Sequence, residues 1–215
     1  STSDTEAILQ LIARSNKENT IARFIDALFQ IEGAYALVAL TNKKLIGVRD
    51  PLGIRPLVIG KLDEYFILAS ETCALDIIGA SFVREVENGE IVVITKDGIE
   101  SIKPFPFRKA RPCVFEYIYF SRPDSSLGGV SVYECRKAFG RQLALETPIE
   151  ADLVIPVPDS GVPAAIGFAE ASNIPFELGI IRNHYVGRTF IEPQQSIREF
   201  SVKLKHNANR ILVEG

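Results

Sequence analysis

The sequence predicts an α+β unit followed by an α/β unit, and three observations support this prediction. In the first half, short β-rich runs follow two helical patterns, whereas in the second half helical patterns alternate with apolar runs. Between the halves, residues 103–112 hold three prolines and four basic residues without periodicity, which is typical of a boundary between packed units. The length of 215 residues allows one or two domains, and we place two, at 1–105 and 106–215.

Two helices are expected at the start of the first unit. Ser3 and Glu6 have the S-x-x-E spacing of a capping box, so a helix should begin near Asp4. Gly33 should end a second helix, because Gly readily adopts the conformation that stops one. The face of that second helix is marked by apolar residues at helical spacing: Ile21, Phe24, Ile25, Leu28 and Phe29.

Antiparallel strands are expected in the rest of the first unit, because short apolar or β-rich runs alternate with turn signals. The runs are 34–41, 45–49, 57–60, 65–69, 81–86, 90–95 and 99–102. A short helix is expected near 71–77. The segment 49–57 places Pro51 and Gly53 as a type I turn prefers, and a structural hairpin suffices to explain it.

The second unit is expected to hold a parallel sheet with crossover helices. A β-rich run at 114–120 comes first. A helix at 132–146, a buried strand at 152–157, a helix at 163–171 and a strand at 177–181 then alternate along the chain. Alternation of this kind is typical of α/β units.

Composition excludes some classes of partner. Lys and Arg number 24 against 27 Asp and Glu, so the net charge of -3 argues against nucleic acid binding. The longest apolar runs, 34–40 and 153–157, are far shorter than the roughly 20 residues that span a bilayer, so we expect a soluble protein with no membrane partner.

The cysteine spacings indicate the cellular compartment, and the absence of methionine indicates that the chain belongs to a longer protein. Cys73, Cys113 and Cys135 have spacings that match no compact zinc or disulfide framework, which favours a reducing compartment, the cytoplasm or an organelle matrix. Cys73 and Cys135 lie on predicted helices and are interpreted as structural. Since the chain starts at Ser1 and contains no Met, we expect it to be an interior piece of a longer protein.

The turn Asp159-Ser160-Gly161 is the first candidate site. It follows the apolar run 153–157 and precedes a predicted helix. Ligands bind at the carboxyl ends of strands in open parallel sheets, and a helix N-terminus offers backbone N–H groups to an anion. A phosphate or pyrophosphate would suit this turn. An ordinary strand-to-helix turn, with Asp159 or Ser160 as N-cap, explains the same residues.

Residues 182–198 are the second candidate. They contain three arginines, hydroxyl side chains and a glycine without periodicity, which suits a mobile loop that closes over a polyanionic substrate. A surface loop with solvated charges, including His184, is the alternative. Cys113 could be a buried thiol or a metal ligand. Because no further cysteines lie at metal-ligand spacing from it, the buried thiol is favoured.

Five segments, taken together and in order, resemble the glutamine phosphoribosylpyrophosphate amidotransferases. They are TSDTE at 2–6, RDPLGIRPL at 49–57, ASETCALD at 69–76, FEYIYFSRPD at 115–124 and YVGRTFI at 185–191. The resemblance implies part of an N-terminal-nucleophile glutaminase domain, which is an α/β/β/α sandwich, followed by part of a type I phosphoribosyltransferase domain.

The resemblance also implies roles for particular residues. Asp4 matches the aspartate that pairs with the α-ammonium group of glutamine. Cys113 matches a position that ligates a 4Fe-4S cluster in the members that carry one. Asp159, Ser160 and Gly161 match the loop that holds pyrophosphate. The flexible loop that closes over phosphoribosylpyrophosphate is matched by Tyr185, Gly187, Arg188 and Thr189.

The activity that the resemblance implies belongs to purine synthesis. Ammonia released from glutamine would react with Mg²⁺-bound phosphoribosylpyrophosphate to give 5-phosphoribosylamine, with glutamate and pyrophosphate as by-products, in a homo-oligomer. The family's nucleophilic cysteine and its main ribose-phosphate loop have no match in the chain, so we expect no catalytic residue and no activity from the chain alone. The alternatives are a non-catalytic binding or regulatory module that retains the fold, and a phosphoribosyltransferase of base salvage, which would share only the second half.

Overall fold

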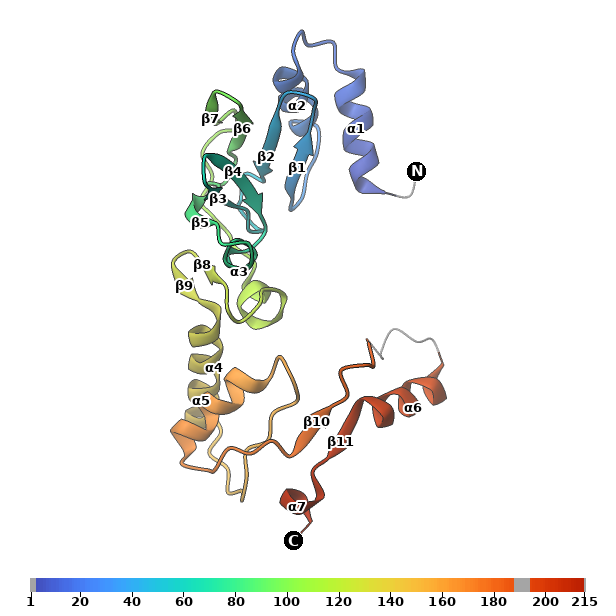
Figure 1. Cartoon of the computed structure of the whole chain (residues 1–215), viewed down its shortest axis with the longest axis vertical. Coiled ribbons are helices and arrows are strands. Elements are labelled where there is room, and N and C mark those ends of the chain that lie inside the picture. Colours follow the sequence, from blue (N-terminus) through green and yellow to red (C-terminus); the bar gives the residue numbers. More distant parts are fainter. Residues whose placement is uncertain (1–2, 188–193, 215) are drawn as a thin grey trace. The chain divides into compact units, whose positions relative to one another are not determined.

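The computed structural model describes residues 3–187 and 194–214 and divides into two compact units, Ser1–Val114 and Phe115–Gly215 (Figure 1). The segment predicted as a linker is hydrogen-bonded to the first unit. The N–H of Arg111 donates to the carbonyl of Leu52 at 2.7 Å, and the N–H of Cys113 donates to the carbonyl of Ile54 at 3.1 Å. These bonds attach the end of the segment to the first compact unit, which extends to Val114.

The first unit contains the predicted helices and strands in the predicted order. Its helices are α1 (Asp4–Arg14), α2 (Thr20–Leu28) and α3 (Thr72–Ile77). Its strands are β1 (Ala36–Leu40), β2 (Leu45–Arg49), β3 (Val58–Leu62), β4 (Tyr65–Ala69), β5 (Ser81–Glu85), β6 (Ile91–Thr95) and β7 (Gly98–Ile102). They form two antiparallel sheets, in the orders β1-β2-β6-β7 and β4-β3-β5, so the antiparallel prediction is confirmed.

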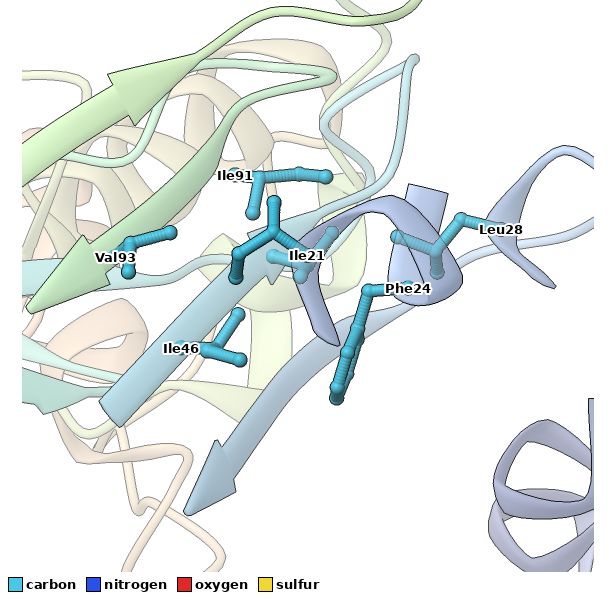
Figure 2. Close-up of a cluster of buried hydrophobic side chains, with 7 residues drawn as sticks. Ile21, Phe24, Leu28, Ile46, Ile91 and Val93 are labelled. Carbon is cyan, nitrogen blue, oxygen red and sulfur yellow. The ribbon is translucent and has the colours of Figure 1, made fainter. Parts of the chain in front are cut away.

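Helix α2 covers one face of the β1-β2-β6-β7 sheet. Figure 2 shows side chains of α2 meeting side chains of β2 and β6. The helical spacing of apolar residues therefore predicts the buried face correctly, although α2 ends at Leu28, before Gly33. The residues labelled in this cluster are Ile21, Phe24, Leu28, Ile46, Ile91 and Val93.

The opposite face of β6 packs against the second sheet. Val92 and Ile94 alternate with the residues that face α2, and they cluster with Ile59 of β3. On the far side of the second sheet, Val58 of β3 packs with Leu75 of α3. Helix α2, the two sheets and α3 thus stack in the order α/β/β/α, which is the layer order that the resemblance implied.

The turn after β2 is not a hairpin, so that interpretation is wrong. Strand β2 pairs with β1 and β6, whereas β3 pairs with β4 and β5, so the turn carries the chain from one sheet to the other. The fully buried carboxylate of Asp50 accepts hydrogen bonds from the N–H groups of Leu52 and Ile54, at 2.9 and 3.0 Å. The Arg49 guanidinium donates to the carbonyls of Gly53 and Arg55, at 3.0 and 2.9 Å. These side chains stabilise a crossing between sheets that turn chemistry alone could not distinguish from a hairpin.

The described part of the second unit contains more helix than strand. Its helices are a π-helical turn (Glu116–Phe120), α4 (Val132–Glu146), α5 (Val162–Ser172), α6 (Gln195–Lys205) and α7 (Arg210–Val213). Its strands are β8 (Ser126–Leu127), β9 (Val130–Ser131), β10 (Ile180–Arg182) and β11 (His206–Ala208). The predictions of helices at 132–146 and 163–171 are confirmed, the first at the same bounds. Helix α6, strand β11 and helix α7 were not predicted.

The β-rich run 114–120 forms the π-helical turn instead of a strand. Arg136 of α4, whose side chain is almost fully buried, donates to the carbonyl of Tyr117 from Nε and to that of Ser121 from Nη2, both at 2.7 Å. The Ser121 hydroxyl donates to the buried carboxylate of Glu116 at 2.6 Å. These bonds satisfy polar groups that a strand would have to pair elsewhere, so tertiary contacts override the strand propensity of the aromatic and β-branched residues.

The expected parallel sheet is reduced to a single bridge. Val154 pairs with Phe176 in parallel, and no strand forms over 152–157. The strand expected at 177–181 is shifted to β10, which pairs antiparallel with β11. Pro156 and Pro158 explain the first difference, because proline lacks the N–H group that a central ladder requires. Within the two described ranges, no helix combines the length and apolar character needed to cross a membrane.

Candidate functional site

The turn that leads into α5 depends on close backbone packing. The N–H of Gly161 donates to the carbonyl of Val157 at 3.1 Å, and the N–H of Val162 donates to that of Asp159 at 3.3 Å. A Cβ atom on Gly161 would lie 2.8 Å from the Val157 carbonyl oxygen, which is closer than real Cβ contacts allow. Glycine is therefore required for this turn. Neither predicted N-cap is used, because Gly161 holds the cap position and no side chain caps the helix.

Asp159 makes an ion pair with Arg182 across the second unit. Its Oδ2 accepts a hydrogen bond from Nη1 of Arg182, the last residue of β10. The pair is partly open to solvent, since the Asp159 side chain is 57% exposed and the Arg182 side chain 30%. The Nε atom of Arg182 is shielded from solvent and makes no hydrogen bond within the described residues. The turn therefore presents one carboxylate, one guanidinium and one glycine-dependent backbone bend.

The segment after β10 is anchored by Asn183. Its N–H donates to the carbonyl of Lys205 at 2.7 Å, which ties the start of the segment to the end of α6. Its Oδ1 accepts the N–H of Tyr185 at 3.0 Å, and the Tyr185 side chain is fully exposed. Of the residues predicted for the flexible loop, Tyr185 and Gly187 are described, whereas Arg188 and Thr189 lie outside the described residues.

Asp4 is the first residue of α1 and is exposed. The predicted helix start is confirmed, but the predicted side-chain cap by Ser3 does not form. The carbonyl of Ser3 accepts the N–H groups of Glu6 and Ala7, at 3.2 and 3.4 Å, while the Ser3 side chain makes no cap hydrogen bond. Asp4 and Glu6 place negative charge in the first turn, where the helix dipole stabilises it. The Asp4 carboxylate is accessible to a cationic group.

Cys113 does not gather metal ligands around it. Its thiol is free and partly buried, like that of Cys135, whereas Cys73 is buried. Over residues 3–187 and 194–214, no group of three His, Cys, Asp or Glu side chains could hold a metal ion. A cluster needs several thiolates or comparable ligands, so the described residues do not fit one.

Arg182 and Asn183 are the site residues that sequence reasoning did not single out. Both lie inside the stretch 182–198, but their partners are remote in sequence. Asp159 precedes Arg182 by 23 positions, and Lys205 follows Asn183 by 22. No local spacing rule connects such residues, so only the folded chain reveals the contacts.

Comparisons with known proteins decide the family. The glutamine amidotransferase domain family matches residues 1–76. The amidophosphoribosyltransferase of Rhizobium etli is 60% identical over 220 residues, which cover 100% of this chain and 44% of the relative. The chain belongs to the amidophosphoribosyltransferase family. The chloroplastic amidophosphoribosyltransferase 1 of Arabidopsis thaliana is 53% identical over 214 residues, covering 99% of this chain and 38% of that relative.

A solved amidophosphoribosyltransferase has the same fold over this region. It is the glutamine phosphoribosylpyrophosphate amidotransferase of Bacillus subtilis, determined in complex with ADP and GMP. The similarity has a TM-score of 0.91 at 47% identity and covers 100% of this chain and 47% of that chain. The chain thus spans less than half the length of the amidophosphoribosyltransferases reported above.

Proposed function

We propose that this chain forms part of the glutamine site and part of the phosphoribosylpyrophosphate site of an amidophosphoribosyltransferase. The observation that carries the proposal is the 60% identity to the Rhizobium etli enzyme across all of this chain. The whole enzyme would transfer ammonia from glutamine to Mg²⁺-bound phosphoribosylpyrophosphate, giving 5-phosphoribosylamine, glutamate and pyrophosphate, in the synthesis of purines. Its compartment would be the cytoplasm or an organelle matrix, and it would be a homo-oligomer.

Residues 1–105 would be the glutaminase part. Within it, the exposed Asp4 carboxylate would accept the α-ammonium group of glutamine in a charge-assisted hydrogen bond, which selects an amino acid over a simple amide. The match of the glutamine amidotransferase domain family to residues 1–76 supports this role, because Asp4 lies inside the matched region.

Residues 106–215 would be the phosphoribosyltransferase part. The bend at Asp159, Ser160 and Gly161 would hold the pyrophosphate of the substrate, with backbone N–H groups as donors and the guanidinium of Arg182 nearby. Tyr185, Gly187, Arg188 and Thr189 would belong to the loop that covers it. Water exclusion at the site would protect the intermediate from hydrolysis.

Of the two cofactors that the family resemblance implies, we propose a role for Mg²⁺ and none for an iron–sulfur cluster. Mg²⁺ would arrive with phosphoribosylpyrophosphate and neutralise its charge, as hard cations do on phosphate oxygens. No step is assigned to an iron–sulfur cluster, because the described residues around Cys113 supply no further ligands.

The test of the glutamine role places this chain in the corresponding region of the Rhizobium etli relative and compares the resulting enzyme with its Asp4→Asn variant. Formation of phosphoribosylamine from glutamine should fall by at least about tenfold, the effect of losing one charge-assisted contact, whereas formation from free ammonia should persist. Equal loss with both nitrogen donors would contradict a role in glutamine binding.

The inactivity of the 215-residue chain is tested directly. No residue of the chain matches the family's nucleophile, so incubation with glutamine should release no ammonia above the uncatalysed background. Release above background would overturn this part of the proposal. It would also exclude the alternative of a non-catalytic binding module.

A further inference from the structure

The Asp159–Arg182 ion pair raises a question that the proposed function leaves open. Asp159 lies in the bend that would receive a polyanion, yet it carries a negative charge itself. Its carboxylate already uses one N–H of the guanidinium that a phosphate group would seek. A carboxylate oxygen and a phosphate oxygen are alternative acceptors for the same donor.

We infer that Asp159 is an internal competitor of the pyrophosphate group: its carboxylate holds Arg182 in the absence of ligand and is displaced when a phosphate takes the guanidinium. This inference rests on the proposed pyrophosphate site and adds Arg182 to it as a ligand-binding residue. The chemical class of the displacing group is a pyrophosphate, free or within a larger substrate.

The geometry of Arg182 supports displacement rather than permanent pairing. Only Nη1 is bonded to Asp159, so the ion pair is a single-donor contact rather than a two-donor fork. A guanidinium can bind a phosphate through two parallel N–H groups, which a single carboxylate contact leaves unused here. A pyrophosphate therefore offers Arg182 more acceptors than Asp159 does.

The exposure of the pair makes the exchange reversible. The Asp159 side chain is 57% exposed, so water can solvate the carboxylate once it leaves Arg182. Partly exposed ion pairs are weak, in contrast to buried pairs whose separation leaves an unsolvated charge. Arg182 is less exposed, at 30%, and sits at the end of β10, whose pairing with β11 holds its backbone in place.

The inference predicts the sign of one substitution. If Asp159 were a positioning residue that merely orients Arg182, Asp159→Asn would weaken pyrophosphate binding. If it is a competitor, the same change removes a like charge from the bend that receives the ligand and frees the guanidinium, so binding should tighten about fivefold. The two roles therefore give opposite results.

The experiment measures the dissociation constant of inorganic pyrophosphate for the 215-residue chain by isothermal titration calorimetry in metal-free buffer. The wild-type chain is compared with Asp159→Asn, with Asp159→Ser as a second variant, and with Arg182→Gln. Asp152→Asn is the matched control, because it removes the same charge from an exposed position of the same unit. Circular dichroism checks that each variant is folded.

We expect both Asp159 variants to bind about fivefold more tightly than wild type, Asp152→Asn to change affinity less than about twofold, and Arg182→Gln to bind more weakly. Equal or weaker binding by the Asp159 variants, with Arg182→Gln still impaired, would overturn the competitor role and leave the proposed site intact. Wild-type affinity in Arg182→Gln would remove Arg182 from the site and overturn the inference. Absence of binding by every chain, wild type included, would overturn both the inference and the proposed pyrophosphate site.

Discussion

Gly140 of α4 lies directly against the Ala164 carbonyl of α5. A Cβ atom on Gly140 would fall 1.8 Å from that oxygen, and one on Gly167 would fall 2.0 Å from the Lys137 carbonyl oxygen. The two helices therefore approach each other at two glycines, one from each helix. Because the obstructing atoms belong to the backbone, a side chain cannot rotate away to make room.

Gly140→Ala should consequently destabilise the chain by about 2 kcal/mol or more, as overpacking of a close contact does. Helix propensity alone would predict the opposite, a gain of about 1 kcal/mol from replacing glycine with alanine. Urea unfolding followed by circular dichroism measures the difference. Ala138→Ser, which adds one atom to the exposed face of the same helix, is the control and should shift stability by less than about 0.5 kcal/mol. A stabilised Gly140→Ala chain would contradict the contact.

Glu90 should make stability depend on acid pH. Burial by itself raises the pKa of this carboxyl, but hydrogen bonds from Arg84, Ser101 and the N–H of Glu87 outweigh burial and hold the pKa below its ordinary value of 4.5. A lowered folded-state pKa contributes stability that is present above pH 4.5 and is lost as the pH falls through the folded value.

Glu90→Gln tests this dependence. The variant should lose about 1 to 3 kcal/mol at neutral pH, because an amide replaces the buried carboxylate that accepts hydrogen bonds from Arg84, Ser101 and the N–H of Glu87. Its unfolding free energy should also fall less steeply than that of wild type below pH 4.5, since one linked proton is gone. Lys103→Gln, at an exposed pair with Glu87, serves as the control and should have little effect. Equal slopes of unfolding free energy against pH in wild type and Glu90→Gln, below pH 4.5, would contradict the prediction.

Arg136→Lys should destabilise the second unit by about 2 kcal/mol, because a lysine cannot donate to two carbonyls in the fixed fork that a guanidinium provides. Arg136 reaches the carbonyls of Tyr117 and Ser121 from a nearly fully buried position. Arg141→Lys on the same helix is the matched control, because Arg141 is half-exposed and pairs with surface carboxylates. Thermal unfolding measures the melting temperatures of both variants. Equal melting temperatures would contradict the role of the Arg136 guanidinium as a donor to two carbonyls.

Tyr35→Phe should be neutral or stabilise the chain by about 1 kcal/mol at pH 7, since it removes a buried hydroxyl that has no hydrogen-bond partner within the described residues. Burial, and after it the charge of Asp50, raises the pKa of Tyr35 from 10.0 to about 12. Because the folded pKa is the higher one, the associated stability is present below pH 10 and is lost as the pH rises toward 12. The variant should lack that alkaline loss.

The control for Tyr35→Phe is Tyr117→Phe, whose lost hydroxyl donates to the carbonyl of Leu127 at 3.1 Å. This change should cost about 1 kcal/mol, the usual net value of a hydrogen bond. Urea unfolding at neutral and alkaline pH distinguishes the two variants. A Tyr35→Phe chain as unstable as Tyr117→Phe would show that the Tyr35 hydroxyl has a partner after all.

Local patterns predict the first unit well. The spacing of Ile21, Phe24 and Leu28 identifies the face of α2 that packs on the sheet, and the runs 45–49 and 65–69 coincide with β2 and β4. Period and turn chemistry are properties of neighbouring residues, so they can be read along the chain. The order of the five motifs likewise indicates the family, and the identity to the Rhizobium etli relative confirms it.

Partners remote in sequence were not predictable in the same way. The turn at Asp50 looks like a hairpin because its own residues favour one, yet the strands on either side pair with other strands. The run 114–120 has strand propensity but is held in a π-helical turn by Arg136, from another helix. In both cases tertiary contacts outweigh a local conformational preference of less than about 1 kcal/mol per residue.

The sequence by itself determined the family, the helices and strands of the first unit and the glycine-containing bend at 159–161. Only the tertiary structure decided how the strands divide between two sheets, which carbonyls Arg136 binds and that Asp159 pairs with Arg182. The physical reason is the distance along the chain over which each interaction acts. Backbone propensity and hydrophobic period act over a few residues, whereas an ion pair or a buried guanidinium joins groups whose separation along the chain carries no information about their distance in space.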